Sequence, residues 1–187
     1  MSDSQKANDD IERLVVASQA GDKGAFDQLV RLYQRRAMQL AVRMLGDASE
    51  AAETVQNAFV RAYLNIGKLK QTKRFEIWLL RIVTNAAISQ RRIAKRRKER
   101  IKIANGRGEN DSAVSPVDKQ IAEELKDAIQ QAMLKLPKNQ AKAISLFGLK
   151  GLSHKEVAEI MDCSVEAARW YVFRARQKLK VLLKEYL

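Results

Sequence analysis

Cysteine, histidine and proline are scarce in this sequence of 187 residues, which contains one cysteine, one histidine and two prolines. A single cysteine cannot form an internal disulfide, and no cluster of cysteine and histidine has the spacing of metal ligands. We therefore expect a fold that needs no disulfide, no metal and no other cofactor.

Long apolar runs are also lacking, because arginine, lysine or glutamine interrupts them every few positions. No window approaches the roughly 18 apolar residues that would span a bilayer. The N-terminal stretch MSDSQKANDD lacks the apolar segment of a secretion signal. These absences predict a cytoplasmic protein without membrane insertion.

Helix-breaking residues are few, with two prolines and eight glycines in the whole chain. No run alternates between apolar and polar residues in the way that a half-buried strand requires. Apolar residues at spacings of three or four recur instead. The sequence therefore predicts an all-α fold.

Positive charge is abundant: 35 Lys and Arg stand against 22 Asp and Glu, a net charge of +13. It is concentrated in two blocks. Residues 68–102 hold 13 basic and two acidic residues, and residues 169–184 hold six basic residues and no acid. Ordinary solvated surfaces, the alternative explanation, intersperse both signs. Two separated blocks predict two contacts with a polyanion.

The N-terminal part is expected to form four helices, over residues 9–20, 24–45, 48–66 and 75–102. Residues 103–115 are rich in turn formers and have almost no large apolar side chains, which is typical of a flexible linker. The predicted domains are thus a helical bundle over residues 9–102, the linker over residues 103–115, and a smaller helical domain over residues 116–187.

Caps mark several of these helix ends. Gly46 suits a helix C-cap, and Asp47 suits the N-cap of the next helix. Ser115 and Pro116 suit the start of the second domain, because proline is favoured at the first helical position. Pro137 ends that helix, and short helices are expected at residues 138–147, 153–161 and 165–185.

The last two helices have the pattern of a helix-turn-helix. Ser153 and Glu156 form a capping box ahead of an apolar pattern, and Ser164 can cap the final helix after a tight turn. A basic second helix in such a pair is typical of one that enters the major groove of DNA. His154 has no second metal ligand nearby, so we expect it to contact solvent or phosphate. Cys163 is expected to be a small buried residue.

The final helix divides into two faces. Its packed face is expected to hold Val165, Ala168, Val172, Ala175, Leu179 and Leu183. The opposite face exposes Trp170 and Phe173, which indicates a contact surface, the alternative being that they pack on the preceding helix. Arg169 and Gln177 suit base edges, and an aromatic ring can lie against a thymine methyl group. The candidate DNA-binding residues are Ser164, Glu166, Arg169, Trp170, Phe173, Arg174 and Gln177.

The helix over residues 48–66 also has two faces. Its apolar stripe is Ala51, Ala52, Val55, Ala58, Phe59, Ala62 and Ile66. On the other face two aliphatic residues, Val60 and Leu64, lie among polar ones, and a plain solvated face does not explain them. We predict a docking surface for a partner helix, formed by Glu53, Gln56, Asn57, Val60 and Leu64.

The helix over residues 75–102 is expected to bury Phe75, Trp78, Leu79, Ile82, Ala86 and Ile93, and to expose Thr84 and Ile88 among basic residues. Trp78 is interpreted as core rather than as a base-stacking residue. The candidate DNA contacts of this helix and of the preceding loop are Lys70, Lys73, Arg74, Arg81, Asn85, Arg91, Arg92 and Lys95.

Four segments in this order resemble the sigma-70 family of RNA polymerase sigma factors, and within it the extracytoplasmic-function (ECF) group that keeps only sigma domains 2 and 4. Residues 21–30 look like the start of domain 2, and residues 50–63 resemble region 2.2. Residues 75–89 resemble regions 2.3 and 2.4. Residues 136–140, 151–160 and 174–179 resemble region 4.

The resemblance implies a non-enzymatic transcription initiation factor. Region 2.2 of such proteins docks on the clamp helices of the polymerase β′ subunit, and region 4 contacts the β flap and reads the -35 element. Regions 2.3 and 2.4 open and read the -10 element. The implied partners are therefore core RNA polymerase and promoter DNA, and an anti-sigma factor is a further partner that the resemblance allows.

Two other functions fit the sequence less well. A helix-turn-helix regulator that acts without polymerase explains the final helix, but it leaves the Val60 and Leu64 face and the first basic block without a role. An enzyme acting on nucleic acid is disfavoured, because the sequence has no paired carboxylates, no nucleophile with a base and no Gly-rich phosphate loop.

Overall fold

A computed structural model describes residues 3–105, 117–149 and 152–186. Within these ranges the chain is helical and has no strand, as the all-α prediction requires. The helices are α1 (Asp3–Gln19), α2 (Lys23–Leu45), α3 (Ala48–Asn65), η1 (Ile66–Lys68), η2 (Thr72–Arg74), α4 (Phe75–Asn105), α5 (Val117–Leu134), α6 (Lys138–Phe147), α7 (His154–Met161), α8 (Val165–Leu182) and η3 (Lys184–Tyr186), where η denotes a 3-10 helix.

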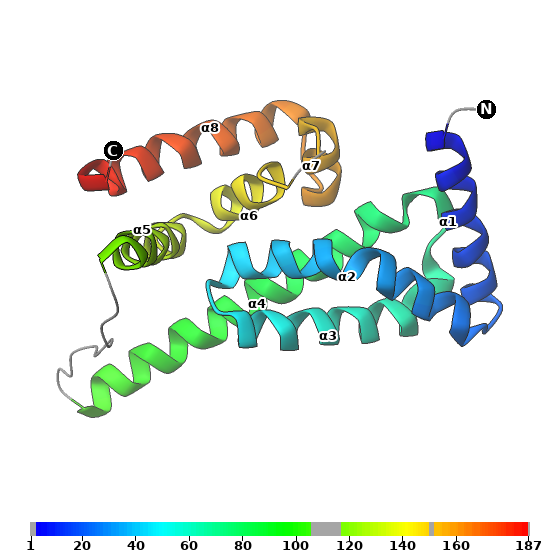
Figure 1. Ribbon diagram of the computed structural model, residues 1–187, viewed down its shortest axis with the longest axis horizontal. Helices are drawn as coiled ribbons and strands as arrows, with labels where there is room; N and C mark the ends of the chain where they lie inside the picture. Colours follow the sequence, from blue (N-terminus) through cyan, green and yellow to red (C-terminus); the bar gives the residue numbers. More distant parts are fainter. Residues whose placement is uncertain (1–2, 106–116, 150–151, 187) are drawn as a thin grey trace.

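Helices α1 to α4 form the N-terminal unit, in which α2, α3 and α4 pack against one another and α1 packs against α2 and the η1–η2 segment (Figure 1). Their ends follow from local capping chemistry. The Asp22 carboxylate accepts from the Ala25 amide at 3.1 Å and starts α2, and Asp47 caps α3 in the same way. Gly46 closes α2 at φ 81°, a conformation that glycine adopts without strain.

Helices α5 to α8 form the C-terminal unit. The capping box of Ser153 and Glu156 is present at the start of α7, and the Ser164 hydroxyl accepts from the Ala167 amide to start α8. Between these helices Asp162 adopts a left-handed conformation with φ 57°, which Asp tolerates better than most residues. The resulting turn supports the predicted helix-turn-helix.

The two units pack directly against each other (Figure 1). Helices α5 and α6 contact α2, and α7 contacts α4, whereas α8 lies on the far side of α6 and α7. Buried apolar side chains of both units form one continuous cluster, to which Leu29 and Leu79 contribute from one unit and Leu146 and Ile160 from the other. The sequence pattern did not predict this contact between the units.

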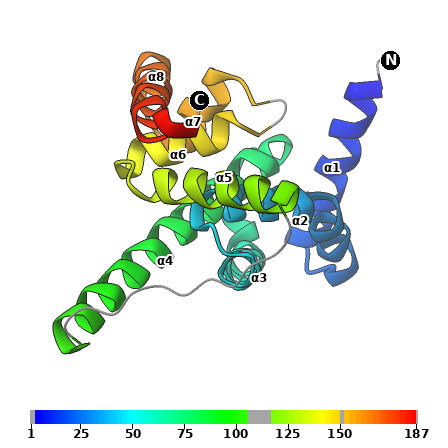
Figure 2. The same cartoon turned by 60° about the vertical axis from the view of Figure 1, so that its left-hand side comes forward.

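The predicted helix boundaries agree with the structure to within a few residues. Helix α6 matches its prediction, α1 begins earlier than expected, and α4 continues to Asn105, three residues into the predicted linker. The rest of that linker, together with Ser115 and Pro116, lies outside the described residues. Figure 2 shows the C-terminal half of α4 extending away from the other helices.

Three core assignments were wrong. Thr84, expected on the surface, is fully buried, in a stretch of α4 whose Arg81 and Asn85 contact the C-terminal unit. Its hydroxyl donates to the Leu80 carbonyl at 2.9 Å. Ile93, expected in the core, is 60% exposed at the point where α4 extends beyond its neighbours. Ala52 is also exposed, because it lines a groove between α2 and α3.

Candidate functional site

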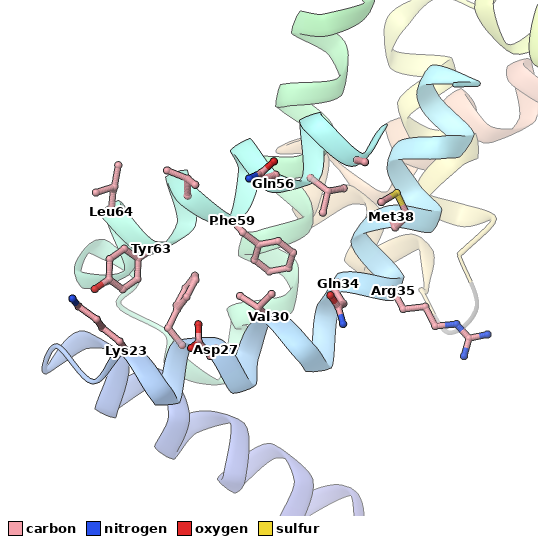
Figure 3. Close-up of a pocket in the computed structure, with 14 residues that line it drawn as sticks. Lys23, Asp27, Val30, Gln34, Arg35, Met38, Gln56, Phe59, Tyr63 and Leu64 are labelled. Atoms are coloured by element: carbon pink, nitrogen blue, oxygen red, sulfur yellow. The ribbon is translucent and has the colours of Figure 1, made fainter. Parts of the chain in front are cut away.

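An apolar groove of about 930 Å³ runs between α2 and α3. Helix α3 lines it with Val55, Gln56, Phe59, Val60, Tyr63 and Leu64, and α2 lines it with Phe26, Val30, Gln34, Met38 and other residues. Figure 3 shows Phe59 of α3 directed toward Val30 of α2, with Lys23 and Asp27 near Tyr63. The groove therefore has an apolar floor and charged groups at its rim, as protein-binding surfaces often have.

The exposed aliphatic residues of α3 are part of this groove. Val60 and Leu64 are 53% and 72% exposed, as their helical spacing predicted. Gln56 also lines the groove, while Glu53 and Asn57 are exposed on α3 outside its lining. The contribution of α2 was missed, because Phe26 and Val30 were assigned wholly to the core stripe. Phe26 is buried and packs edge-on against Tyr63 at 5.0 Å between ring centroids.

Helix α8 has the two faces that its sequence predicted. Ala168, Val172 and Ala175 are buried, and Val165, Leu179 and Leu183 are partly buried. The candidate DNA-binding residues are all exposed, and Trp170 and Phe173 are 54% and 57% exposed. The alternative in which these two aromatic side chains are buried against α7 is therefore wrong.

Local contacts order part of this exposed face. The Arg174 guanidinium lies 5.9 Å from the centre of the Trp170 ring, within range of a cation–π interaction. The Trp170 ring in turn packs edge-on against Tyr171, whose hydroxyl accepts from the Asn139 amide at 3.3 Å. Because Tyr171 connects α8 to α6, the orientation of Trp170 is coupled to the body of the C-terminal unit.

The first turn of α8 carries one acidic side chain, Glu166. Hydrogen bonds from its own backbone amide and from Ser164 lower the pKa of Glu166, so the side chain is anionic at neutral pH.

His154, expected to contact solvent or phosphate, instead packs its ring on Phe147 at 4.3 Å between centroids and is only partly exposed. Cys163 is partly rather than fully buried.

The η1–η2 segment, which carries Lys70, Lys73 and Arg74, is held by α1. The Gln19 side-chain amide donates to the carbonyls of Ile66 and Leu69, both at 2.9 Å. Further along, the Thr72 hydroxyl donates to the Glu12 carboxylate at 2.8 Å, and Lys73 lies 3.4 Å from Glu12. The hydrogen bond from Thr72 lowers the pKa of Glu12, and the Lys73 ammonium lowers it further.

The other side of this segment contacts the C-terminal unit. Arg74 forms an ion pair with the Glu159 carboxylate on α7, and Arg81 donates to the main-chain carbonyl of the same residue. Ten residues further along α4 than Arg81, Arg91 donates to the carbonyls of Met133 and Leu134 at 3.2 and 3.0 Å. These carbonyls lie at the C-terminal end of α5, the negative end of the helix dipole.

A lysine of α6 is buried at the same interface. Lys142 is 7% exposed, and its ammonium donates to the Asn85 side chain at 3.4 Å. Burial, together with the nearby positive charge of Arg81, lowers the pKa of Lys142. Burial likewise lowers the pKa of Arg91. Cationic side chains from both units are therefore desolvated where the units meet.

The eight candidate residues of α4 and of the loop before it have different surroundings in the structure. Arg74, Arg81, Asn85 and Arg91 all contact the C-terminal unit, and Lys73 contacts α1. Lys70 and Arg92 are exposed. The side chain of Lys95 lies outside the described part of the structure. Spacing alone could not identify Glu159 or Lys142 as their neighbours.

Within the described residues, every helix is too short or too polar to span a lipid bilayer. Nor does that part of the chain hold a group of three or more His, Cys, Asp or Glu side chains placed to bind a metal ion.

The sequence of this chain matches two family models and known proteins. The family model for Sigma-70 region 2 matches residues 29–97, and the model for Sigma-70, region 4 matches residues 126–179. The RNA polymerase sigma-H factor of Pseudomonas aeruginosa is 32% identical over 184 residues, covering 94% of this chain and 95% of that protein. The ECF RNA polymerase sigma factor SigW of Bacillus subtilis is 33% identical, covering 94% of this chain and 97% of that protein.

Solved structures show the same fold. CnrH, in complex with the cytosolic domain of CnrY, matches with a TM-score of 0.68 and 23% identity, covering 94% of this chain and 98% of that one. The sigma factor RpoE of Bartonella quintana, in complex with the anti-sigma factor NepR, matches with a TM-score of 0.62 and 25% identity, covering 85% of this chain and 96% of that one. With a region 2 unit that carries the groove and a region 4 unit that carries the helix-turn-helix, this chain belongs to the sigma-70 family as an RNA polymerase sigma factor of the ECF group.

Proposed function

We propose that this sigma factor divides its work among three surfaces: the α2–α3 groove docks on core polymerase, the exposed face of α8 reads the -35 element, and the basic face of α4 with the η1–η2 segment holds the -10 element. It acts by binding and positioning, not by catalysis, and we place its action in the cytoplasm with the polymerase. The N-terminal unit, within residues 9–102, would thus serve polymerase and the -10 element, and the C-terminal unit, within residues 116–187, the -35 element.

The docking role of the groove is supported by its chemistry. An amphipathic helix binds by placing apolar side chains in such a groove while polar groups pair at the rim. Val60 and Leu64 expose apolar surface that a soluble protein gains from covering. Lys23, Asp27 and Arg35 along α2 offer charges of both signs to fix the orientation of the partner helix.

The proposed role of α8 at the -35 element is supported by the residues on its exposed face. Arg169 and Gln177 have the side chains that pair with guanine and adenine edges in the major groove. Both are exposed on the same side of α8 as Trp170. The ring of Trp170 is held by Tyr171 and Arg174 and presents a rigid apolar surface of the kind that can lie against a thymine methyl group.

The proposed role of α4 at the -10 element is supported by its positive charge. The segment from Lys68 to Lys102 has the densest positive charge of the chain, and phosphate contacts by Lys and Arg provide much of the affinity of proteins for DNA. Bases extruded from an opened strand would be held between these cationic groups rather than modified.

The observation that carries this proposal is the apolar groove, which lies on a different helix pair from both basic surfaces. A regulator that binds DNA by itself has no use for such a groove, whereas a factor that brings polymerase to a promoter requires it. The RpoE structure with NepR also supports an anti-sigma factor as a further partner.

A run-off transcription assay with core polymerase and a library of candidate promoters tests the proposal. We expect transcripts from a defined subset of promoters only when the chain is added. Tight, sequence-specific DNA binding by the free protein, unchanged on adding polymerase and without any new transcript, would instead support the stand-alone regulator.

A further inference from the structure

Helix α8 exposes an indole ring at the position from which a recognition helix contacts DNA bases. The helix begins at Val165, after the Ser164 cap, so Trp170 lies in its second turn. In a helix-turn-helix, residues near the start of the second helix contact base edges in the major groove. The Trp170 side chain is 54% exposed there. A large apolar surface at this position is left for a partner to cover.

The Trp170 ring is held in place by the protein itself. It packs edge-on against Tyr171, with 5.4 Å between ring centroids, and the Arg174 guanidinium lies 5.9 Å from its centre. The Tyr171 hydroxyl accepts from the Asn139 side chain on α6, which connects the ring to a second helix. A side chain that is already ordered loses little conformational entropy on binding. The ring is therefore suited to select one shape and one chemistry in its partner.

The charge around the ring identifies duplex DNA as that partner. Residues 169–184 hold six basic residues and no acid, and Arg169 and Arg174 near the ring are both exposed. Trp and Arg are also common at the centres of protein interfaces, but the cores of those interfaces are depleted of charge. A DNA groove is instead bordered by phosphates on both sides, which neutralise such a basic face. The major groove therefore fits this surface better than a protein does.

The base edges in the major groove offer one apolar group. It is the C5-methyl group of thymine, whereas the other groups that distinguish the bases are hydrogen-bond acceptors and amino groups. An indole ring has a single N–H donor at its rim and no acceptor. A polar group covered by the face of the ring would lose its water without a replacement, which costs free energy. A methyl group has no such cost and gains from being covered.

We propose that Trp170 reads the C5-methyl group of one pyrimidine in the -35 element. Thymine and 5-methylcytosine both carry this group, so either base satisfies the contact, whereas uracil and unmethylated cytosine do not. The inference rests on the proposed role of α8 at the -35 element and adds the chemical group that is recognised. Promoter binding therefore responds to methylation of a cytosine at this position. The effect is that of one buried methyl group, about four-fold in affinity.

Removal and addition of single methyl groups in promoter DNA test the proposal. The chain in complex with core polymerase is titrated with labelled promoter fragments that were selected by run-off transcription. Deoxyuridine replaces each thymine of the -35 element in turn, which removes one methyl group and leaves the base pair intact. At the position that responds, cytosine is then compared with 5-methylcytosine. We expect uracil to weaken binding about four-fold at one position, and 5-methylcytosine to bind about four-fold more tightly than cytosine there.

Trp170→Ala should bind the thymine promoter less tightly and should no longer distinguish thymine from uracil. Trp170→Phe keeps an aromatic ring and should retain part of the difference. Tyr186→Ala is the matched control, because Tyr186 is an aromatic residue of the same unit that is 50% exposed on η3, outside α8. This variant should keep the whole difference. Circular dichroism should show unchanged helix content in all three variants, since both side chains are exposed.

Three outcomes would overturn the proposal. The first is that no pyrimidine of the -35 element responds to loss of its methyl group. The second is a response that is as large in Trp170→Ala as in the unsubstituted protein, or that disappears only in Phe173→Ala, because another group would then read the methyl. The third is a response to uracil without a response to 5-methylcytosine, which would assign the contact to another atom of thymine.

Changes of whole base pairs in the same element separate this proposal from the proposed function. If such changes leave binding of the polymerase complex unaltered, α8 does not read the -35 element and the proposed function fails. If they weaken binding while removal and addition of methyl groups have no effect, only the methyl proposal fails.

Discussion

The side-chain amide of Gln19 donates to the main-chain carbonyl of Leu69 at 2.9 Å and thereby joins α1 to the segment between α3 and α4. A second bond of equal length runs from the same amide to Ile66. The η1 and η2 turns have no side-chain caps of their own, so contacts from α1 hold this segment in shape. Because Lys70, Lys73 and Arg74 project from it, Gln19 is a positioning residue for the proposed -10 surface.

We expect Gln19→Leu to lower the free energy of unfolding by about 1 to 2 kcal/mol, since two hydrogen bonds are lost and two carbonyls lose their partner. Promoter opening, followed by permanganate reactivity of unpaired thymines, should fall further than polymerase binding does. Gln39→Leu, at an exposed position of α2, is the control. If the Gln19→Leu protein opens promoter DNA normally at a temperature where it is folded, then Gln19 does not position the proposed -10 surface.

The sequence was sufficient for elements whose signals are local. The Ser153–Glu156 capping box and the Asp47 cap lie within three residues of their partners, and the spacing of Val172 and Ala175 on α8 reports burial within one helix. Contacts between the units have no such local signal. Thr84 is buried between Arg81 and Asn85, whose partners lie 78 and 57 positions away in the chain, so a helical wheel of α4 alone assigned it to the surface.

At the groove, the sequence pattern predicted the α3 wall but not the α2 wall. Val60 and Leu64 were identified because exposed aliphatic residues conflict with the polar face around them. Phe26 and Val30 follow the ordinary apolar spacing of a buried helix face, and nothing in that spacing separates core from groove wall. Glu159 was missed for a similar reason, since an acidic residue on a short helix is also expected where the helix only faces solvent.

The groove provides a second prediction. Val60→Asp or Leu64→Asp should weaken binding to core polymerase by about 30-fold or more, because a charge would enter the centre of an apolar contact. Binding is measured by competition for polymerase against a labelled sigma factor, and circular dichroism should show unchanged helix content. Leu32→Asp introduces the same charge at a position of α2 that is 59% exposed and outside the groove, and should bind normally. Unfolding of the Val60 and Leu64 variants would assign these side chains to the core.

Helix α8 provides a third prediction. Arg169→Ala and Gln177→Ala should each reduce discrimination between matched and mismatched -35 elements by roughly 1 to 3 kcal/mol, the value of a bidentate base contact. Affinities of the polymerase complex are compared on the two promoters over a range of salt. Lys180→Ala, an exposed change on the same helix, should weaken binding on both promoters alike. An Arg169 variant that keeps upstream discrimination but fails to open DNA would reverse the assignment of the two basic surfaces.

The buried ammonium of Lys142 provides the last prediction. Its pKa is lowered from 10.5 in the folded protein, first by burial and then by Arg81, while the nearby Cys163 and Asp162 act in the opposite direction. Proton release from Lys142 is therefore easier in the folded than in the unfolded protein. The contribution of Lys142 to the free energy of unfolding should rise as the pH rises from that lowered pKa toward 10.5, and should fall as the pH falls through the same window.

Lys142→Met removes this charge while nearly keeping the side-chain length, so it should stabilise the folded protein by about 1 kcal/mol or more at neutral pH. In a Cys163→Ser background, which removes the titrating thiol nearby, the free energy of unfolding should rise with pH through this window, and Lys142→Met should lose that rise. Lys138→Met, at an exposed position of the same helix, should retain the pH dependence. Should Lys142→Met destabilise the protein instead, the hydrogen bond to Asn85 would outweigh the cost of burying the ammonium.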